Sequence, residues 1–565
     1  MRNVQKTIAY FLPIYLVIAG SLFCIKLQAQ EQQGDTLKPI SNFRWWYQNL
    51  LPTPYSGPKN KLLMPMAVGY TDFDDKIRDL QLLGKLQLEQ SLTIRPYILT
   101  PKLGYDSILA MIDPEFENHG HLVESKHSDI QLLPINFLQK YNSHHPYGWN
   151  DGPLRFSKGY QFVGSGGVYM RWRNIHLTLR PEYFKTASDP YETSAAWGQR
   201  TSALSKLTFG QSSLRMDFGP LSVGVSNQNL WLGPGQYSSL LMSNNAPGFN
   251  HFSVGTNRPF KTPIGSFELN IIGGTLTNNI MQVYESKNLK LAQSLDKSNR
   301  YINLLSLTYS PILFKNFYIG FNRAFQQFTQ KSPSTNLQKY YFIALQPLFR
   351  NQYRDDGIPI DQLISGFAKY LFPRENAEIY FEYGWNDGSS NLRDLTLEVS
   401  HSAASIFGLK KITKFSSKSY LTIQAEATKL AQSPGFLQRN ASNWYEHGLL
   451  TAGYTNSNQI LGSGSGMGNN IQTIVINWNK NWTKYGIKFQ HIFQNPMRIV
   501  NNDYTNLYLG DIDWHDYSYG VTINQKVKNI LFNLNVENVN SKNFLWKGNY
   551  NVNNLYIFFN TIYLW

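Results

Sequence analysis

The chain has 565 residues, a formal net charge of +15 and an aromatic content of 15%, whereas only 42% of its residues are hydrophobic. The charge is dilute over this length and no block of five or more lysines and arginines occurs, so the composition excludes a nucleic-acid-binding protein. A soluble core of this size would be richer in Leu, Val and Ile. The aromatic residues therefore suit another environment, such as two membrane interfaces or surfaces that stack against sugars.

The first segment, residues 1–29, is predicted to be a cleaved secretory signal peptide. Arg2 and Lys6 provide a basic start, residues 7–25 are apolar, and Ala29 is a small residue just before the expected cleavage point. This order of a basic region, an apolar region and a small residue is typical of such signals.

A retained membrane anchor is the alternative for this segment, and a lipid anchor is another. A membrane helix needs about 20 apolar residues, and Lys26 with a polar, Gln-rich tract ends the apolar run. Lipidation at Cys24 would need a small preceding residue, and Phe23 is bulky. Because Cys24 is the only cysteine of the chain, we expect a mature protein without disulfides or thiol chemistry.

Residues 30–150 are expected to form a mixed periplasmic segment with helices and the first strand or strands. In 74–88, Ile or Leu recurs every third residue behind acidic residues, which predicts a helix. Residues 128–141 predict a second helix, kinked at Pro134, and residues 91–99 predict a strand between the helices. We expect a small helical subdomain packed against the mouth of a barrel.

The remaining chain, residues 151–565, is predicted to be a transmembrane antiparallel β-barrel, so that the fold is all-β with a small α part. In 421–428 and 532–537, apolar and polar residues alternate, as in strands that face different solvents on their two sides. A soluble β-sandwich could show the same alternation, but many strands without an apolar run favour a closed membrane wall. At about 20 to 25 residues for each strand and its loop, we expect an even number of about 16 to 20 strands.

The C-terminus supports the same fold. Apolar residues occupy alternate positions in 555–565, and the last residue is Trp565. This pattern resembles the terminal strand signal that the barrel-assembly machinery reads, so that machinery and outer-membrane lipid are the expected partners. The predicted location is the outer membrane of a Gram-negative bacterium.

Several motifs resemble those of one family, the Wzi-type capsule assembly proteins. The resemblance covers most of the mature chain. It implies a barrel of about eighteen strands with a small periplasmic helical bundle, no enzymatic activity, and a lectin-like role in holding capsular or related surface polysaccharide on the cell. The residues that carry it are 146–152, 158–161, 231–235, 243–249, 361–362, 372–373, 378–383, 401–402, 444–448, 453–455 and 462–468.

One hexapeptide, Tyr-Gly-Trp-Asn-Asp-Gly, occurs at both 147–152 and 383–388. Asn-Asp-Gly is typical of turns, and the aromatic residues would suit an interfacial girdle. Alternatively, the Trp rings stack on sugars while the amides and carboxylates bind hydroxyls. With the family-like loops, the candidate polysaccharide-binding residues are Trp149, Asn150, Asp151, Trp231, Asn244, Asn245, Trp385, Asn386, Asp387, Trp444, Tyr445 and His447.

The stretch 231–249 is rich in Gly, Pro and amides, which is too irregular for a strand facing lipid. Such backbone is tolerated at membrane depth only where protein or water surrounds it. We therefore consider two placements, a plug or constriction inside the lumen and an ordinary external loop.

Two groups of residues have the side chains of a reactive site but not its spacing. Glu378 and Glu382 share one strand face but lie roughly 13 Å apart along a strand, whereas a glycosidase pair is about 5–10 Å apart. The histidines of the loop-like tract lack a register that would bring zinc ligands together. We expect no enzyme, no cofactor and no metal site. These histidines are His119, His121, His127, His144 and His145.

The leading interpretation is thus a monomeric outer-membrane protein that binds and anchors surface polysaccharide and assists capsule assembly. The alternative is an outer-membrane channel or porin for small solutes, and a third possibility is a secreted soluble β-protein.

Overall fold

The structure is a computed structural model, and part of the chain is described in it. The predicted signal peptide lies outside the described residues. No helix in the described part is long and apolar enough to cross a bilayer. The described residues are 72–98, 105–125, 127–193, 203–277, 300–328, 360–386, 399–433, 443–447, 453–495, 499–502, 505–508 and 512–565.

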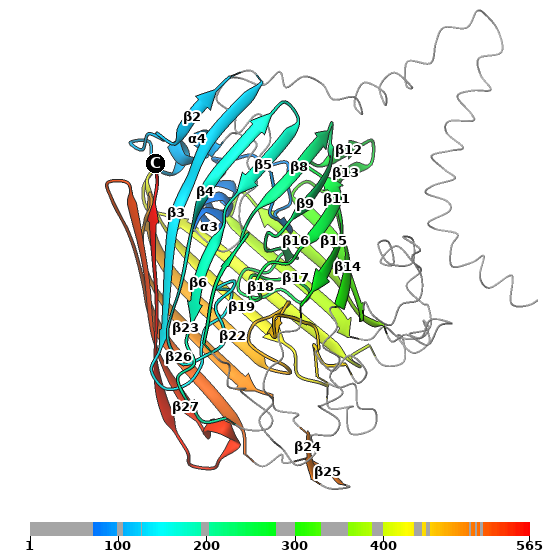
Figure 1. Cartoon of the computed structure of the whole chain (residues 1–565), viewed down its shortest axis with the longest axis vertical. Coiled ribbons are helices and arrows are strands. Elements are labelled where there is room, and N and C mark those ends of the chain that lie inside the picture. The colour runs from blue at the N-terminus through cyan, green and yellow to red at the C-terminus, as the bar shows by residue number, and fades with distance from the viewer. Residues whose placement is uncertain are drawn as a thin grey trace, which may run out of the picture. The chain divides into compact units, whose positions relative to one another are not determined.

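A closed antiparallel β-barrel makes up most of the described residues (Figure 1). Its wall has 18 strand positions within these residues, which confirms the predicted fold class. Some wall positions are shared by two short strands. For example, β5 and β6 both pair with β4, and β11 and β12 both pair with β13.

The strand bounds follow the chain. The wall strands are β2 (His121–Glu124), β3 (Ser128–Asn142), β4 (Gly159–Trp172), β5 (Ile175–Leu179), β6 (Glu182–Thr186), β7 (Leu204–Thr208), β8 (Ser213–Phe218), β9 (Leu221–Ser226), β11 (His251–Thr256), β12 (Phe260–Thr262), β13 (Gly265–Leu276), β14 (Arg300–Pro311), β15 (Phe317–Phe328), β16 (Asp361–Phe372), β17 (Ala377–Asn386), β18 (Ala403–Lys414), β19 (Ser419–Lys429), β22 (Asn470–Lys480), β23 (Thr483–Gln494), β26 (Trp514–Val527), β27 (Ile530–Lys542) and β28 (Val552–Tyr563).

Shorter elements lie in the lumen and in the connections. They are α3 (Phe73–Leu82), β1 (Ile94–Arg95), α4 (Tyr105–Ile112), β10 (Trp231–Leu232), β20 (Thr455–Asn456), β21 (Gln459–Ile460), β24 (Ile499–Asn502), β25 (Thr505–Tyr508) and the 3-10 helix η4 (Phe544–Trp546).

The barrel closes between β3 and β28, the first long strand and the last. Their register runs from Tyr556 opposite Asn142 to Tyr563 opposite Ile135. Closure leaves no strand edge facing lipid, so every backbone group of the wall has a partner strand. The C-terminal pattern noted in the sequence is thus part of the closing strand.

The predicted helix at 128–141 is wrong, because this range forms β3. The spacing of its apolar residues fits a helix face, but the same range also alternates, and Phe137 and Tyr141 point outward. Pro134 lies where the register with β4 shifts between Leu133 and Asn136. A bulge tolerates proline because no ladder hydrogen bond is needed there.

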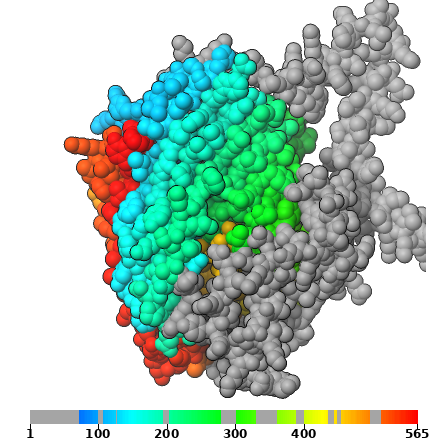
Figure 2. All heavy atoms as spheres, viewed as in Figure 1, coloured from blue at the N-terminus to red at the C-terminus, as the bar shows by residue number. Residues whose placement is uncertain are grey.

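The alternation predicted from the sequence sorts side chains between the two faces of the wall. In β19, Thr422 and Glu426 are buried on the luminal face, whereas Ile423 is 37% exposed on the outer face. In β17, Glu382 is luminal and Phe381 points outward. Figure 2 shows the blue-to-green strands as a continuous outer surface.

Helix α3 lies inside the barrel and not merely against its mouth (Figure 1). It was predicted over 74–88 but ends earlier, before Gly84, whose positive φ of 72° stops the helix. Of the strand predicted over 91–99, the described residues retain only the two-residue β1.

Salt bridges fasten α3 to the luminal wall. Lys410 of β18 lies 2.6 Å from Asp79, and Lys484 of β23 lies 3.0 Å from Asp72. The hydroxyl of Tyr420 donates to Asp79 at 2.9 Å. The helix therefore supplies acids to basic groups that the wall would otherwise bury alone.

Replacing Lys410 with Met should loosen α3. The change leaves the buried Asp79 carboxylate without its ammonium partner, which costs about 3–5 kcal/mol. We expect hydrogen exchange of the α3 backbone amides to accelerate by at least about 100-fold. Lys411→Met is the matched control, because Lys411 lies on the opposite face of β18. Equal exchange rates in the wild type and in Lys410→Met would contradict this role.

Candidate functional site

The two ends of the barrel differ in the length of their connections. At one end, residues 481–482 join β22 to β23 and residues 528–529 join β26 to β27. At the other end, residues 143–158 join β3 to β4 and residues 227–250 join β9 to β11. Outer-membrane barrels have short periplasmic turns and long extracellular loops, so the long connections mark the extracellular end.

The connection 227–250 folds into the lumen, which favours the plug over the external loop. Its β10 pairs with β1 of the N-terminal segment, with Trp231 opposite Arg95. The guanidinium of Arg95 donates to the carbonyl of Gly235 at 2.9 Å. The N-terminal segment and the loop thus occupy the lumen together. We call residues 227–250 the lumen loop.

Wall carboxylates hold the backbone of the lumen loop. Glu426 accepts the N–H groups of Gln236 at 2.7 Å and of Tyr237 at 3.2 Å. The hydroxyl of Tyr380 also donates to Glu426 at 2.7 Å. The side-chain amide of Gln236 donates to Glu378 at 2.5 Å. Buried carboxylates need such donors, so wall and loop satisfy each other.

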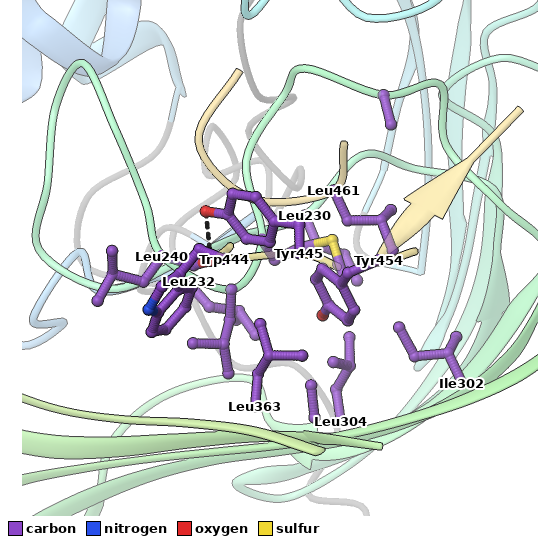
Figure 3. Close-up of a cluster of buried hydrophobic side chains, with 14 of the residues drawn as sticks. Leu230, Leu232, Leu240, Ile302, Leu304, Leu363, Trp444, Tyr445, Tyr454 and Leu461 are labelled. Carbon is purple, nitrogen blue, oxygen red and sulfur yellow. Dashed lines mark hydrogen bonds between the residues drawn. The ribbon is translucent and has the colours of Figure 1, made fainter. Parts of the chain in front are cut away.

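An apolar cluster lies between the lumen loop, the wall and the connection after β19 (Figure 3). Tyr445 donates its hydroxyl to the carbonyl of Leu240 at 2.9 Å and accepts the N–H of Ser463 at 2.8 Å. This joins two extracellular connections that lie far apart in the sequence. The labelled members are Leu230, Leu232, Leu240, Ile302, Leu304, Leu363, Trp444, Tyr445, Tyr454 and Leu461.

The first hexapeptide, 147–152, is fastened to the lumen loop through Asn244. The Asn244 amide donates to the carbonyl of Asn150 at 2.9 Å, and the N–H of Gly152 donates to the carbonyl of Asn244 at 2.8 Å. Asn150 has a positive φ of 62° and donates its side-chain amide to the carbonyl of Tyr237 at 2.9 Å. The turn chemistry expected of this motif is therefore present.

Asp151 stabilises this turn through a buried salt bridge. Its carboxylate lies 2.5 Å from the ammonium of Lys140, and both side chains are buried. Lys140 also donates to the carbonyl of Gly148 at 3.0 Å. Burial raises the pKa of the Asp151 carboxyl, while Lys140 opposes that rise.

The second hexapeptide is placed differently although its sequence is identical. Trp385 lies on the outer face of β17, packs against Tyr383 with ring centroids 5.0 Å apart, and donates its indole N–H to the carbonyl of Val399. Asn386 is buried and its amide reaches the carbonyl of Glu446 at 3.3 Å. Asp387 lies outside the described residues.

Several other candidate residues are buried. The Arg95 guanidinium lies over the ring of Trp231, 4.5 Å from its centroid, and the indole of Trp444 donates to the carbonyl of Ser402 at 2.9 Å. Asn245 donates to the carbonyl of Ile460 at 2.9 Å. The described candidates that keep a partly exposed side chain are Trp149, Asn150, Trp385 and His447.

Within this set, Trp149 and Asn150 lie together at the extracellular end. Trp149 packs on Tyr147 with ring centroids 5.9 Å apart, and it borders the cluster that contains Ile471 and Tyr556. Sequence reasoning missed the residues that position this turn and the lumen loop, above all Lys140, Tyr237 and Glu426. Their only signal was that Lys140 and Glu426 alternate with apolar neighbours.

The comparisons agree with this architecture. A family model described as capsule assembly protein Wzi matches residues 150–530. The chain belongs to this family. Wzi of Escherichia coli, described as an outer membrane protein involved in group 1 capsule assembly and as a carbohydrate-binding β-barrel, has the same fold. It is 12% identical, with a TM-score of 0.59 covering 89% of this chain and 100% of that chain.

Other solved barrels are less similar. OprD of Pseudomonas aeruginosa is 6% identical, with a TM-score of 0.36 covering 76% of this chain and 92% of that chain. OccD3 (OpdP) of the same organism is 10% identical, with a TM-score of 0.39 covering 79% and 94%. No curated protein matches this chain.

Histidines also lie at the extracellular end of this Wzi-family barrel. The His145 ring is buried against Phe544 of η4, with ring centroids 4.7 Å apart, and its Nε2 lies 3.4 Å from the Ser541 hydroxyl. Burial and, to a smaller extent, the adjacent His144 lower the pKa of His145 to about 3.

This burial predicts a pH dependence of stability. Unfolding returns His145 to an ordinary pKa of about 6.5, so the unfolded chain binds a proton that the folded chain excludes. The contribution of the neutral, buried His145 to the free energy of unfolding is therefore fully present above about pH 6.5. It is lost as the pH falls toward 3, by up to about 1.4 kcal/mol per pH unit.

We expect His145→Gln to remove that component of the pH slope. The measurement is the free energy of unfolding at pH 7 and pH 5 in detergent. His127→Gln is the control, since it makes the same substitution at an exposed position in a short connection. An unchanged slope in His145→Gln would show that His145 does not titrate as described.

Proposed function

We propose that this protein binds capsular or related surface polysaccharide at the extracellular end of the barrel, anchors it on the cell and assists capsule assembly. Membership of the Wzi family carries this proposal. The E. coli relative with the same fold is described as carbohydrate-binding, which supports the same class of ligand here.

The geometry supports Trp149 and Asn150 as contact residues. A partly exposed indole offers an apolar face to a sugar ring, and Asn150 lies beside it in the same turn with a partly exposed side chain. Lys140 and Asn244 hold the turn in place, so little loop entropy would be lost on binding. His447 is the further partly exposed candidate.

Retention on the cell would come from many weak contacts. A polysaccharide repeats the same sugar unit, so successive contacts with neighbouring barrels raise the overall affinity well above that of one contact. Without Arg2, Lys6 and Lys26 of the signal peptide, the formal net charge is +12, which favours acidic polymers, and added salt should weaken that attraction.

The remaining features of the proposal follow from the sequence. A signal peptide at residues 1–29 exports the chain, and the barrel-assembly machinery recognises the strand that ends at Trp565. The protein acts in the Gram-negative outer membrane as a monomer and does not catalyse a reaction. Burial of Glu378 and Glu382 beneath the lumen loop supports the absence of a glycosidase pair.

The two copies of the hexapeptide allow a matched test. Trp149→Ala should weaken binding of the detergent-purified protein to purified capsular polysaccharide by about tenfold, because a stacking surface is lost. Trp385→Ala makes the same chemical change on the outer face of β17 and should bind like the wild type. Affinity is measured by surface plasmon resonance on immobilised polysaccharide. A glycan array with the same proteins shows which sugars are bound.

The outcome separates a binding site from a girdle. Wild-type affinity in Trp149→Ala would remove that residue from the site. Equal weakening in both variants would point to a general effect on the barrel instead of a contact at the extracellular end.

A further inference from the structure

A cleft lies in the lumen between the N-terminal segment 90–98 and the inner faces of β8, β9, β11 and β13. Strand registers place Ser222 opposite Gly255 and Gly224 opposite Ser253 on this part of the wall. These four positions on the luminal face of β9 and β11 are small, so the wall leaves room there that larger side chains fill elsewhere.

The cleft extends to the end of the barrel with the short turns. Asn257 and Arg258, which line it, belong to the turn between β11 and β12. The N–H of Asn257 donates to the carbonyl of Pro220 in the turn between β8 and β9. The other end is lined by Leu230 and His251 beneath the lumen loop. The cleft therefore faces the periplasm and is distinct from the extracellular site.

Several polar groups that line the cleft are not used by the fold. Gln90 is 3% exposed; its Nε2 donates to the carbonyl of Ile98 at 2.6 Å, whereas its Oε1 has no hydrogen-bond partner among the described residues. Within the same residues, Ser253 and Asn270 make no side-chain hydrogen bond and Arg258 has no ion-pair partner. These groups supply hydroxyl, amide and guanidinium contacts to one space.

The acids at and beside the cleft already accept hydrogen bonds from the protein. Glu268 accepts the N–H of Ser91 at 2.7 Å. Asp217 accepts from Arg215 at 2.9 Å and lies 3.2 Å from His176. A negative ligand group would therefore be attracted to Arg258, whereas the Glu268 carboxylate, which has no salt-bridge partner among the described residues, is engaged by the Ser91 N–H.

We propose that this cleft is a second binding site, reached from the periplasm, for a sugar that carries one carboxylate. Neutral donors and acceptors on both walls suit ring hydroxyls, and Arg258 suits a carboxylate through paired N–H donors. The ring of Tyr97 and the side chain of Ile94 supply apolar surface in the cleft. A phosphate would instead favour several clustered cations.

The inference goes beyond the proposed function, because it concerns the opposite end of the barrel and needs no extracellular residue. The test uses the full chain in detergent with sodium glucuronate as the probe, and calorimetry as the readout. Methyl glucoside and inorganic phosphate are the comparison ligands. We expect saturable glucuronate binding that exceeds binding of either comparison ligand.

Two variants, Arg258→Gln and Ser253→Leu, test whether glucuronate binds in the cleft, and Arg374→Gln is their control. Arg258→Gln should weaken glucuronate binding by at least about tenfold through loss of a charge-assisted contact. Arg374→Gln removes the same charge from the exposed turn between β16 and β17 and should leave affinity unchanged. Ser253→Leu should abolish binding by filling the cleft, with the barrel fold checked by circular dichroism.

Capsular polysaccharide binding is measured on the same samples. Loss of glucuronate binding with polysaccharide binding retained would support a separate periplasmic site. Glucuronate affinity that survives both Arg258→Gln and Ser253→Leu would overturn the inference, as would equal binding of phosphate or methyl glucoside. Neither result would bear on the extracellular site.

Discussion

The polar inner face of an 18-strand wall is the constraint on which the rest of the structure depends. A barrel of this size leaves a wide lumen, and charged groups that project into it must be hydrated or paired. Here Lys410 is paired with Asp79 of α3, and Lys484 with Asp72, which immediately precedes that helix, while Glu426 accepts backbone N–H groups of the lumen loop. The charges of the wall thus determine which segments fill the lumen and where they lie. The dependence is mutual, because the polar groups of α3 and of the lumen loop would be buried without partners if the wall did not supply them.

The same interactions set the shape of the extracellular end. The lumen loop carries Asn244, which fixes the turn of Trp149 and Asn150, and Leu240, which fixes Tyr445. Contacts thus run from the buried carboxylates to the surface on which a glycan would lie. Most of the candidate residues are structural parts of this scaffold, and few side chains remain accessible for a ligand. A binding surface of this kind changes little on binding, which suits weak, repeated contacts with a polymer.

Alternation in the sequence was enough to predict the wall, because a period of two is imposed wherever lipid and water face opposite sides of a strand. It failed at 128–141, where apolar residues fit both a helix and a strand, and only pairing with β4 and β28 decides between them. The acidic residues of α3 predicted where the helix begins in the sequence. They did not predict that it lies inside the barrel, because their partners lie more than 300 residues away in the chain. The two hexapeptides could not be distinguished locally. Trp149 lies in a turn held by the lumen loop, whereas Trp385 lies on the outer face of a strand.

Single-channel recording of the purified full chain in planar bilayers is the most direct test of a lumen filled by α3 and the lumen loop. Because wall and inserted segments satisfy each other's charges, we expect no steady open-channel current at moderate voltage. A large, steady conductance in the wild-type protein, of the size expected for an unobstructed barrel, would contradict the filled lumen and would favour a solute channel.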